Sequence, residues 1–308
     1  MTTGGRRPPS LRLATRGSAL ALAQTELAVA ALSAVGIVSI ETVVIRTRGD
    51  RDAHTPVAEM DSQGWFTGEL EAALQQGRAD VAVHSAKDLP DQLGAGLAVC
   101  AHLPRADCRD ALVTRDGRTL EELPEGSTVG TGSPRRASLL AALRPGLRAV
   151  PIRGNVDTRL RKLDEGEVDA LLLACAGLDR LGLGVRATQR LDPEALVPAP
   201  AQGALALEVV AGSEAAALCA AVDDAATTAS VAAERSVLRA LGGGCRLPLG
   251  AWGRLEGGRL RLLAALVVDG AVHRVDVDGE PDDYERIGAL AAARLRRLAG
   301  AAAATVLR

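Results

Sequence analysis

A lysine and an aspartate stand side by side directly after a strongly apolar segment of the chain. The segment Ala79–Ser85 (ADVAVHS) has the composition of a buried strand, and Lys87 and Asp88 follow it within HSAKDLP. A carboxylate and a cation held at the end of a strand are suited to acid–base chemistry. An exposed Lys-Asp turn after a strand has the same spacing, so the pair by itself leaves both interpretations open.

Two Gly-Ser turns form a second candidate site. Gly17-Ser18 and Gly132-Ser133 each follow a strand-like segment and precede a helical pattern. A serine at a helix start can cap the helix, and the free N–H groups there can bind an anion. Capping alone explains both serines equally well.

Arginines flank both turns. Arg16 ends the first strand-like segment, and Arg135 and Arg136 lie in the first turn of the helix that follows the second. Arginine in a first turn opposes the helix dipole, which costs on the order of a few tenths of a kcal/mol unless an anion compensates. Because Arg153 and Arg159 follow the next strand, the five guanidinium groups predict a ligand with several carboxylates or phosphates.

The abundance of arginine also has a less specific explanation. All but two of the 36 basic residues are arginine, the exceptions being Lys87 and Lys162, and a GC-rich genome produces such a bias. A basic solvated face accounts for any one of the arginines, although less well for all five together.

The cysteines favour a reducing compartment. There are five, an odd number with no C-x-x-C pair, and the four histidines are scattered, so we expect neither a disulfide framework nor a metal site. Cys100, Cys175 and Cys219 stand among apolar neighbours and are expected in the core. Cys245 follows three glycines, and both a nucleophilic thiol and a plain glycine-rich turn fit this motif.

Composition limits the class of protein. The 308 residues carry a net charge of −2, with 47% hydrophobic and 24% charged residues, which is ordinary for a globular chain of two or three domains. Only four residues are aromatic, so platforms that stack nucleic-acid bases are not expected. No run of about 18 uncharged apolar residues is present. We therefore expect a cytoplasmic protein that binds neither nucleic acid nor membrane.

The elements that must position these residues follow an α/β pattern, in which short apolar runs alternate with helical periods. Strands are expected at Leu11–Arg16, Glu41–Thr47, Ala79–Ser85, Ser127–Ser133, Ala149–Gly154 and Val168–Gly177. Helices are expected at about 18–34, Thr67–Gln76, Pro134–Leu143 and Val156–Glu165.

Repeated motifs predict that the first two-thirds of the chain form two related lobes around a cleft. Three motifs recur in order: Gly17-Ser18 at Gly132-Ser133, Arg48-Gly49 at Arg153-Gly154, and the L-x-x-G-x-x-D of Leu74, Gly77 and Asp80 at Leu163, Gly166 and Asp169. At the position of Asp88 the second copy has Gly177, which suggests a task that only the first copy performs.

A smaller α+β domain is expected at the C-terminal end. The segment Ala201–Val210 is interpreted as a strand that returns to the first lobe, and a helical stretch extends from there to Leu241. Two strands (Arg259–Val268 and His273–Gly279) and a helix at about 283–298 follow. The boundaries are 10–104 with 201–222 for lobe 1, 105–200 for lobe 2, and 223–308 for the third domain.

Several motifs together resemble one family. In chain order they are ATRGSALAL, TRGD, VHSAKDLP, GTGSPRR, IRGNVDTRL, LDRLGL, PAQGAL and GGGCRLPLG, and they extend from about Leu11 to the C-terminal helix. The chain resembles the porphobilinogen deaminases (hydroxymethylbilane synthases), which join four porphobilinogen molecules into a linear tetrapyrrole for haem, chlorophyll and corrin biosynthesis.

The resemblance implies a dipyrromethane cofactor joined to Cys245 by a thioether, with Asp88 as the main catalytic residue. It also implies two lobes like those of periplasmic binding proteins, with the cysteine on the α+β domain. Asp50 and Phe66 would belong to the active-site loop, in which Gln63 replaces a lysine of some members. The residues implied around cofactor and substrate are Arg16, Ser18, Gln24, Ser85, Lys87, Thr131, Ser133, Arg135, Arg136, Arg153, Arg159, Arg180 and Gln202.

The chemistry of that family explains the residue types. Each pyrrole carries an acetate and a propionate, and guanidinium groups pair with carboxylates bidentately. Loss of ammonia from porphobilinogen leaves an azafulvene, whose positive charge a carboxylate such as Asp88 would stabilise. Asp88 would also accept the proton that leaves after the next carbon–carbon bond forms. No metal is required.

Two other classes of function remain open from the residues alone. A two-lobed anionic-ligand binding or sensor protein would use the same cleft without catalysis. A thiol-dependent acyltransferase or a Lys87 Schiff-base enzyme would use single parts of the site, but neither explains the arginines. The resemblance instead implies a monomer that takes porphobilinogen and hands its product to uroporphyrinogen-III synthase.

Overall fold

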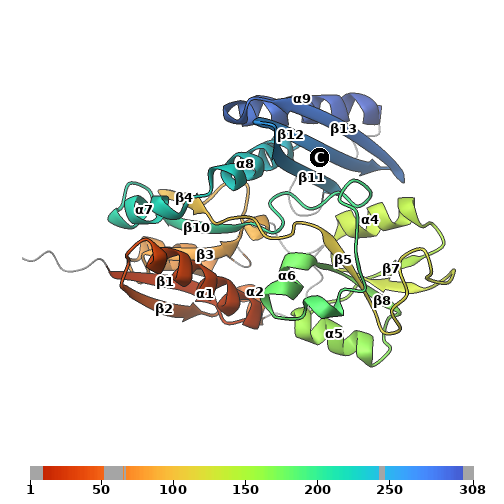
Figure 1. Cartoon of the computed structure of the whole chain (residues 1–308), viewed down its shortest axis with the longest axis horizontal. Coiled ribbons are helices and arrows are strands. Elements are labelled where there is room, and N and C mark those ends of the chain that lie inside the picture. Colours follow the sequence, from red (N-terminus) through yellow and green to blue (C-terminus); the bar gives the residue numbers. More distant parts are fainter. Residues whose placement is uncertain (1–9, 52–64, 66, 243–246, 301–308) are drawn as a thin grey trace, which may run out of the picture.

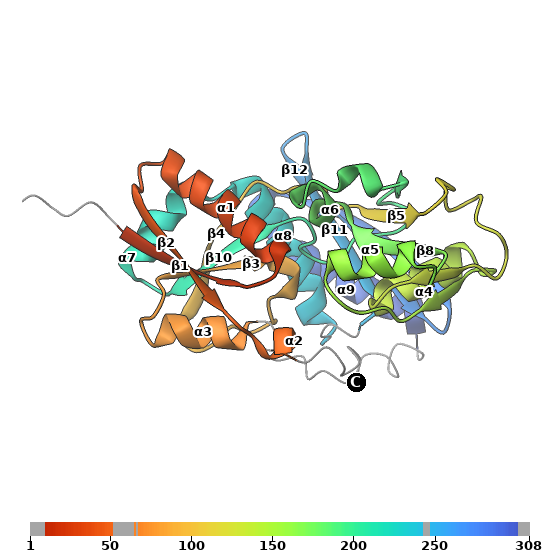
Figure 2. The same cartoon turned by 90° about the horizontal axis from the view of Figure 1, so that it is seen from below.

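The computed structural model describes residues 10–51, 65, 67–242 and 247–300. Phe66, Cys245 and Gln63 lie outside the described residues, and of Asp50 only the backbone is described, in the short helix α2 (Arg48–Arg51). Two five-stranded sheets and one three-stranded sheet make up the described part, and they lie as three neighbouring bodies in Figures 1 and 2.

The first sheet has the strand order β2-β1-β3-β10-β4. Its strands are β1 (Ser10–Arg16), β2 (Ser39–Ile45), β3 (Val81–Ser85), β4 (Leu97–His102) and β10 (Leu205–Val210). β1 pairs in parallel with β2 and β3, whereas β10 lies antiparallel between β3 and β4. Helices α1 (Ala19–Ala34), α3 (Gly68–Gln75) and α7 (Glu214–Cys219) pack on this sheet, which we call lobe 1.

The second sheet has the corresponding order β7-β6-β8-β5-β9. Its strands are β5 (Asp110–Thr114), β6 (Thr128–Gly130), β7 (Arg148–Val150), β8 (Ala170–Ala174) and β9 (Gln189–Arg190), and its helices are α4 (Pro134–Leu143), α5 (Val156–Asp164) and α6 (Cys175–Arg180). β6 pairs in parallel with β7 and β8, and β5 is antiparallel to β8. We call this body lobe 2. Its strands β7, β6 and β8 repeat the arrangement of β2, β1 and β3 in lobe 1.

The repeated aspartates explain why the L-x-x-G-x-x-D motif occurs twice. Asp80 accepts a hydrogen bond from the backbone N–H of Arg12 at 2.8 Å, and its own N–H donates to the Arg12 carbonyl at 2.9 Å. In lobe 2, Asp169 accepts from the Thr128 N–H at 2.7 Å and donates to the Thr128 carbonyl at 3.0 Å. Each aspartate therefore joins the start of one parallel strand to the next, a structural role.

The third sheet is antiparallel and consists of β11 (Leu249–Glu256), β12 (Arg259–Val268) and β13 (Ala271–Gly279). One face packs on α8 (Ala225–Ala240) and α9 (Tyr284–Ala299), through alternate residues of β12 such as Leu260 and Leu262. Val267 points the other way and packs into the core of lobe 2 with Leu139 and Leu196. Alternation along β12 thus buries one face over its whole length and the other face near its C-terminal end.

Two segments connect the lobes, 103–109 and 191–204, and a buried carboxylate holds both of them to the third sheet. Glu234 on α8 accepts from Arg105 Nη1 at 2.6 Å, from the Ala201 N–H at 2.6 Å and from the Gly253 N–H at 2.6 Å. The desolvation of Glu234 is therefore offset by a charged partner and two further donors. One side chain fixes the connections between the lobes to the C-terminal body.

Several expected strands have other limits in the structure. The segment Val168–Gly177 was expected as one strand, but β8 ends at Ala174 and the chain continues as α6. A short apolar run cannot be told from a buried helix by periodicity, and Cys175 and Leu178 are buried in the core of lobe 2. The strand expected from Ala201 begins at Leu205. β4, β5 and β11 had no counterpart among the expected strands.

No helix in the described part of the chain is long and apolar enough to cross a membrane alone, and only the pair Glu214–Val222 and Ala225–Ala240, bent by 106°, has the length and composition together.

Candidate functional site

An open cavity of about 950 Å³ lies between the two lobes. Its wall contains the residues that follow the carboxyl ends of β1, β2 and β3 in lobe 1, and of β6, β7 and β8 in lobe 2. Parallel strands that end at one edge of a sheet bring these residues together. The charged and hydroxyl-bearing or amide residues of the wall are Arg16, Ser18, Gln24, Arg46, Ser85, Lys87, Asp88, Ser133, Arg136, Arg153, Asn155, Thr158, Arg159 and Arg180.

The charge of the wall is strongly unbalanced. Among the described residues, seven cationic side chains line the cavity and Asp88 is the single carboxylate. Burial and the neighbouring cations Arg136 and Arg153 lower the pKa of Arg159 to about 10. Burial lowers the pKa of Arg180 to about 10 as well. Both groups remain charged at neutral pH. The cavity is therefore suited to a ligand with several negative charges.

Both Gly-Ser turns cap helices in the structure. Ser18 Oγ accepts from the Ala21 N–H at 3.2 Å, and Ser133 Oγ accepts from the Arg136 N–H at 3.4 Å. Both serines also line the cavity. Capping and exposure to a ligand are thus compatible at these positions. Gln24, one turn further along α1, donates to Ser85 Oγ at 2.8 Å and links the first turn to the end of β3.

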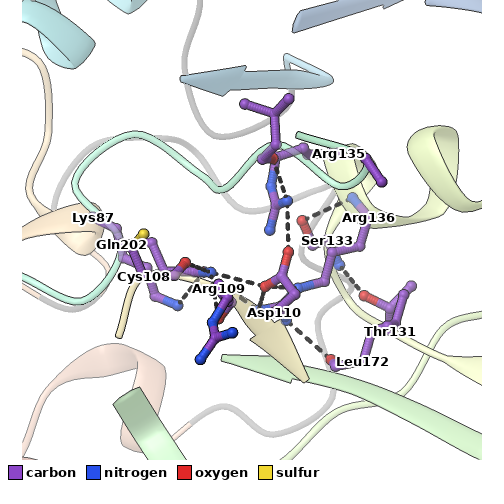
Figure 3. Close-up of polar contacts among 12 residues, drawn as sticks. Lys87, Cys108, Arg109, Asp110, Thr131, Ser133, Arg135, Arg136, Leu172 and Gln202 are labelled. Atoms are coloured by element: carbon purple, nitrogen blue, oxygen red, sulfur yellow. Dashed lines mark hydrogen bonds and ion pairs between the residues drawn. The ribbon is translucent and has the colours of Figure 1, made fainter. Parts of the chain in front are cut away.

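Arg135 and Arg136 have a carboxylate of the protein itself as their partner (Figure 3). Asp110, the fully buried first residue of β5, pairs with Arg135 Nη1 at 2.7 Å and with Arg136 Nη2 at 2.7 Å. Asp110 therefore supplies the negative charge that compensates arginines in a first helical turn, so their position alone does not require a ligand anion. The two arginines hold the pKa of the Asp110 carboxyl well below its usual range.

Only one of these two arginines faces the cleft. Arg136 lines the cavity, and its Nη1 donates to the Leu172 carbonyl at 3.0 Å. Arg135 is 3% exposed, donates to the Val197 carbonyl at 2.7 Å and is absent from the described cavity wall. The structure therefore places Arg135 behind the cleft, on the connection between the lobes.

Gln202 connects Lys87 to this ion-pair cluster (Figure 3). Its amide nitrogen donates to Asp110 Oδ1 at 2.8 Å and to the Cys108 carbonyl at 2.8 Å, which fixes the amide oxygen toward Lys87 Nζ at 3.2 Å. Burial and the nearby Arg136 lower the pKa of Lys87 to about 8. Gln202 and Thr131 are buried and lie outside the described wall; Thr131 Oγ1 accepts from the Ser133 N–H at 3.2 Å.

Asp88 ends the short helical turn Ala86–Asp88 that follows β3. Its side chain is exposed to the cavity and makes no hydrogen bond or ion pair with any residue that the structure describes. The turn is fixed from behind, since the Ala86 N–H donates to the Ala204 carbonyl at 3.0 Å. A free carboxylate on a fixed turn, opposite the arginines of lobe 2, is available for a ligand.

The position that corresponds to Asp88 in lobe 2 makes a contact between the lobes. Gly177 lies in α6, which packs against α1, and a Cβ at Gly177 would meet Leu20 Cδ2 at 3.8 Å. The segment after β3 thus presents a carboxylate to the cleft, whereas the corresponding segment after β8 packs against lobe 1.

Sequence reasoning missed two charged residues of this region. Asp110 was missed because β5 was not expected as a strand, although an aspartate at the start of the apolar run DALVT was a visible signal. Arg46 lines the cavity after β2 and was passed over in favour of the Arg48-Gly49 motif. The described residues contain no group of three or more His, Cys, Asp or Glu side chains that could hold a metal ion.

Comparison with known proteins gives the same family from both parts of the chain. Residues 11–217 match the family model "Porphobilinogen deaminase, dipyromethane cofactor binding domain", and residues 228–297 match "Porphobilinogen deaminase, C-terminal domain". Among solved structures, the methionine binding protein MetQ aligns with a TM-score of 0.45 at 14% identity, over 70% of this chain and 90% of that one.

Curated relatives cover almost the whole chain. The porphobilinogen deaminase of Acidothermus cellulolyticus is 49% identical over 93% of this chain and 88% of its own length. The porphobilinogen deaminase of Roseiflexus castenholzii is 45% identical over 95% of this chain and 98% of its own length. The porphobilinogen deaminase of Leifsonia xyli is 47% identical over 85% of this chain and 80% of its own length. The chain belongs to the porphobilinogen deaminase family.

Proposed function

We propose that this cleft joins four porphobilinogen molecules into linear hydroxymethylbilane with release of ammonia. The observation that carries the proposal is the described part of the cavity wall, in which seven cationic side chains surround one free carboxylate, Asp88. A growing chain of pyrroles brings two carboxylates with every ring, so it needs many cations along its path. A reaction that creates one positive charge at a time needs a negative group at a single point.

A dipyrromethane cofactor fits the residues present. Two linked pyrroles carry four carboxylates, and the cavity of about 950 Å³ offers guanidinium donors from both lobes. We assign its attachment to Cys245, which lies outside the described residues. Arg136 and Arg159 would hold its carboxylates, and Lys87 would pair with a carboxylate of the cofactor or of the incoming substrate. Ser18 and Ser133 would bind through hydroxyl or backbone N–H groups. When bound, the cofactor supplies the pyrrole end from which the chain grows.

Other arginines of the cavity wall would bind the carboxylates of substrate and product. Arg153 and Arg180 line the lobe 2 wall, and Arg16 lines that of lobe 1. Since guanidinium forks bind carboxylates bidentately, they fix orientation as well as position. Arg135, Gln202 and Thr131 would act from behind the wall by holding Arg136, Lys87 and the Ser133 turn in place. Asp50 and Phe66 are assigned to the active-site loop from the family alone.

Asp88 would act at the reacting ring. When the aminomethyl carbon–nitrogen bond of porphobilinogen breaks, its electron pair leaves with ammonia and the pyrrole nitrogen becomes positively charged. A carboxylate beside that nitrogen stabilises the cation. After the free α-carbon of the chain-end pyrrole attacks the methylene carbon, that attacking α-carbon carries an extra proton. Asp88 accepts that proton, which restores the aromatic pyrrole.

We also propose the wider setting of the enzyme. The chain acts as a monomer in the cytoplasm and hands its product to uroporphyrinogen-III synthase. Its domains are 10–104 with 201–222, 105–200, and 223–308. The pairing of β10 with β3 and β4, and the packing of α8 on β11, support this division.

Product stoichiometry tests the proposed reaction. Purified chain is incubated with porphobilinogen, and consumed substrate, released ammonia and tetrapyrrole are measured together. We expect four porphobilinogens consumed and four ammonia molecules released for each bilane. A binding or sensor protein would retain porphobilinogen without releasing ammonia, and that result would overturn the proposal.

A further inference from the structure

Arg46 is a cleft residue to which neither the repeated motifs nor the family resemblance drew attention. It directly follows β2 and lines the part of the cavity that lobe 1 contributes. Its side chain is exposed and makes no hydrogen bond or ion pair with the residues that the structure describes. Arginines elsewhere on the surface, such as the exposed Arg161 and the half-buried Arg186, pair with a carboxylate at 2.7 Å and 2.6 Å.

The two-lobed repeat gives Arg46 a counterpart. β2 occupies the place in lobe 1 that β7 occupies in lobe 2, and the residue that follows β7 on the cavity wall is Arg153. By sequence motif the counterpart of Arg153 is Arg48. Arg48, however, is absent from the described wall, while Arg46 and Gly49 are part of it. At this turn, therefore, the arginine that lines the described cavity wall is Arg46 and not Arg48.

Arg46 also lies next to the end of another strand that contributes a cation to the cavity wall. Arg16 ends β1, where it pairs in register with Ile45 of the neighbouring parallel strand, so Arg46 follows directly beside it. Neighbouring parallel strands are about 4.8 Å apart. Because both side chains line the cavity, a ligand carboxylate bound there can pair with guanidinium groups from two neighbouring strands.

We propose that Arg46 is a further substrate-binding residue, which pairs with a carboxylate of each porphobilinogen as it arrives from solvent. This rests on the proposed function of the cleft. Arg136 is 6% exposed and is tied to Asp110, so it suits a group that stays bound. Arg46 is exposed and untied, so it meets each new molecule first. A cation at the rim of a cleft raises the rate of capture of an anionic ligand.

The test compares Arg46→Gln with Arg46→Lys and with Arg48→Gln as a matched control. The control removes the same charge two residues away, outside the described cavity wall. We measure kcat and KM for porphobilinogen at low and high salt, after intact mass has shown that each variant carries its covalent cofactor. An exposed ion pair is worth about 0.2–1 kcal/mol.

For Arg46→Gln we expect KM to rise about two- to fivefold with kcat within twofold of the parent, and kcat/KM to depend less on salt. Arg46→Lys keeps the charge and should recover most of the loss. Arg48→Gln should resemble the parent. Equal KM values for the two glutamine variants, a fall in kcat alone, or an Arg46→Gln chain without its cofactor would each overturn the proposal. A parent chain that makes no bilane would instead contradict the proposed function.

Discussion

Two aspartates near the cleft are in opposite environments, and this difference separates a structural from a reactive carboxylate. Asp110 is fully buried and accepts from Arg136 and Gln202, and its charge also faces Arg135. Its pKa is held well below the usual range by these partners, so it stays ionised and transfers no proton. Asp88 is exposed and has no such donors among the described residues. Its negative charge is therefore free for the ligand.

Replacement of Asp88 by asparagine tests the reactive role. Asn keeps the size and hydrogen-bonding reach but loses the charge and the proton-accepting ability. Loss of a positioned acid–base group costs about 10²–10⁴ in rate, so turnover should fall by that factor while substrate affinity is largely kept. Asp88→Glu should be more active than Asp88→Asn, because it keeps the charge. The measurement is bilane formation at saturating porphobilinogen, with circular dichroism to verify folding.

The assignment has a defined limit. A folded Asp88→Asn variant with its cofactor attached that kept more than about a tenth of parental turnover would lose less than about 1.4 kcal/mol. So small a loss is inconsistent with a group that both stabilises the cation and accepts the proton.

Lys87 gives the cleft a pH dependence. Its pKa is lowered to about 8 by burial and by Arg136, so it is charged at pH 7 and loses its charge as the pH rises through about 8. A hydrogen bond from a charged donor exceeds a neutral one by roughly 1 kcal/mol. KM for porphobilinogen should therefore rise about fivefold between pH 7 and pH 9. Lys87→Arg stays charged throughout this range and should remove the rise. An identical pH profile of KM in both proteins would contradict the assignment.

At the scale of the elements, apolar periodicity was enough to find the parallel strands and their helices. The helix Pro134–Leu143 has the expected limits, and the expected helix Thr67–Gln76 differs by one residue at each end. The strands that lie antiparallel in each lobe were harder. β5 begins with Asp110 and was hidden by its charged start, and β10 was expected four residues early because the turn before Leu205 is itself buried. The first residues of β5 and β10 are set by pairing with strands far away in the sequence, and the local sequence does not indicate such pairing.

The ion-pair cluster shows the same limitation at the helix α4. Its first-turn arginines suggested a ligand because their partner is 25 or 26 positions away, on a strand that was not expected. The structure changes the expected outcome for the Arg135 variant, since a buried charge loses its partner when either side is removed.

We expect Arg135→Leu to lose about 3–5 kcal/mol of stability, because Asp110 is left with one arginine in a buried site. The melting temperature measures this loss. Asp110→Asn alone should also be destabilised, but the double variant Asp110→Asn/Arg135→Leu should lose less than the sum of the two. Additive losses would mean that the pair is not coupled.

The acid sensitivity of the cluster follows from the same linkage. Because the folded pKa of Asp110 lies below its unfolded value of about 3.9, its stabilisation is present above that value and is lost as the pH falls through the folded pKa. The melting temperature of the parent should therefore fall more steeply below pH 4 than that of Asp110→Asn. Parallel curves would contradict this role of Asp110.

Across the whole molecule, the arrangement of the two lobes brings the candidate residues to one cavity. The sequence motifs located most of the cleft cations, because the ends of repeated strands are local features. They did not reveal that Glu234 binds both connections between the lobes to the third sheet, since its partners are 19 to 129 positions away. The body formed by α8, α9 and the third sheet is thus held to both connections between the lobes by one buried carboxylate.

The covalent cofactor is the prediction that involves all three bodies, because a group attached to the third must reach the cleft between the other two. Chain made with ample porphobilinogen should carry an adduct equal to two porphobilinogen-derived pyrrole units, and acidic Ehrlich's reagent should colour it. Attachment should be confined to Cys245, because burial raises the pKa of Cys108 to about 11 and that of Cys175 to about 12. Their thiols are therefore poor nucleophiles.

Cys100 supplies the matched control for this experiment. It is half-buried on β4, its thiol donates to the Leu207 carbonyl at 3.4 Å, and a hydrogen bond with Cys219 lowers its pKa, so reactivity alone does not exclude it. It lies outside the described cavity wall, however, so a group attached there would not meet the arginines. Intact mass should show the adduct on the parent and on Cys100→Ser, but not on Cys245→Ser. An unmodified parent mass, or an adduct that Cys245→Ser still carries, would overturn the attachment at Cys245. It would also overturn the proposal that a group attached to the third body reaches the cleft.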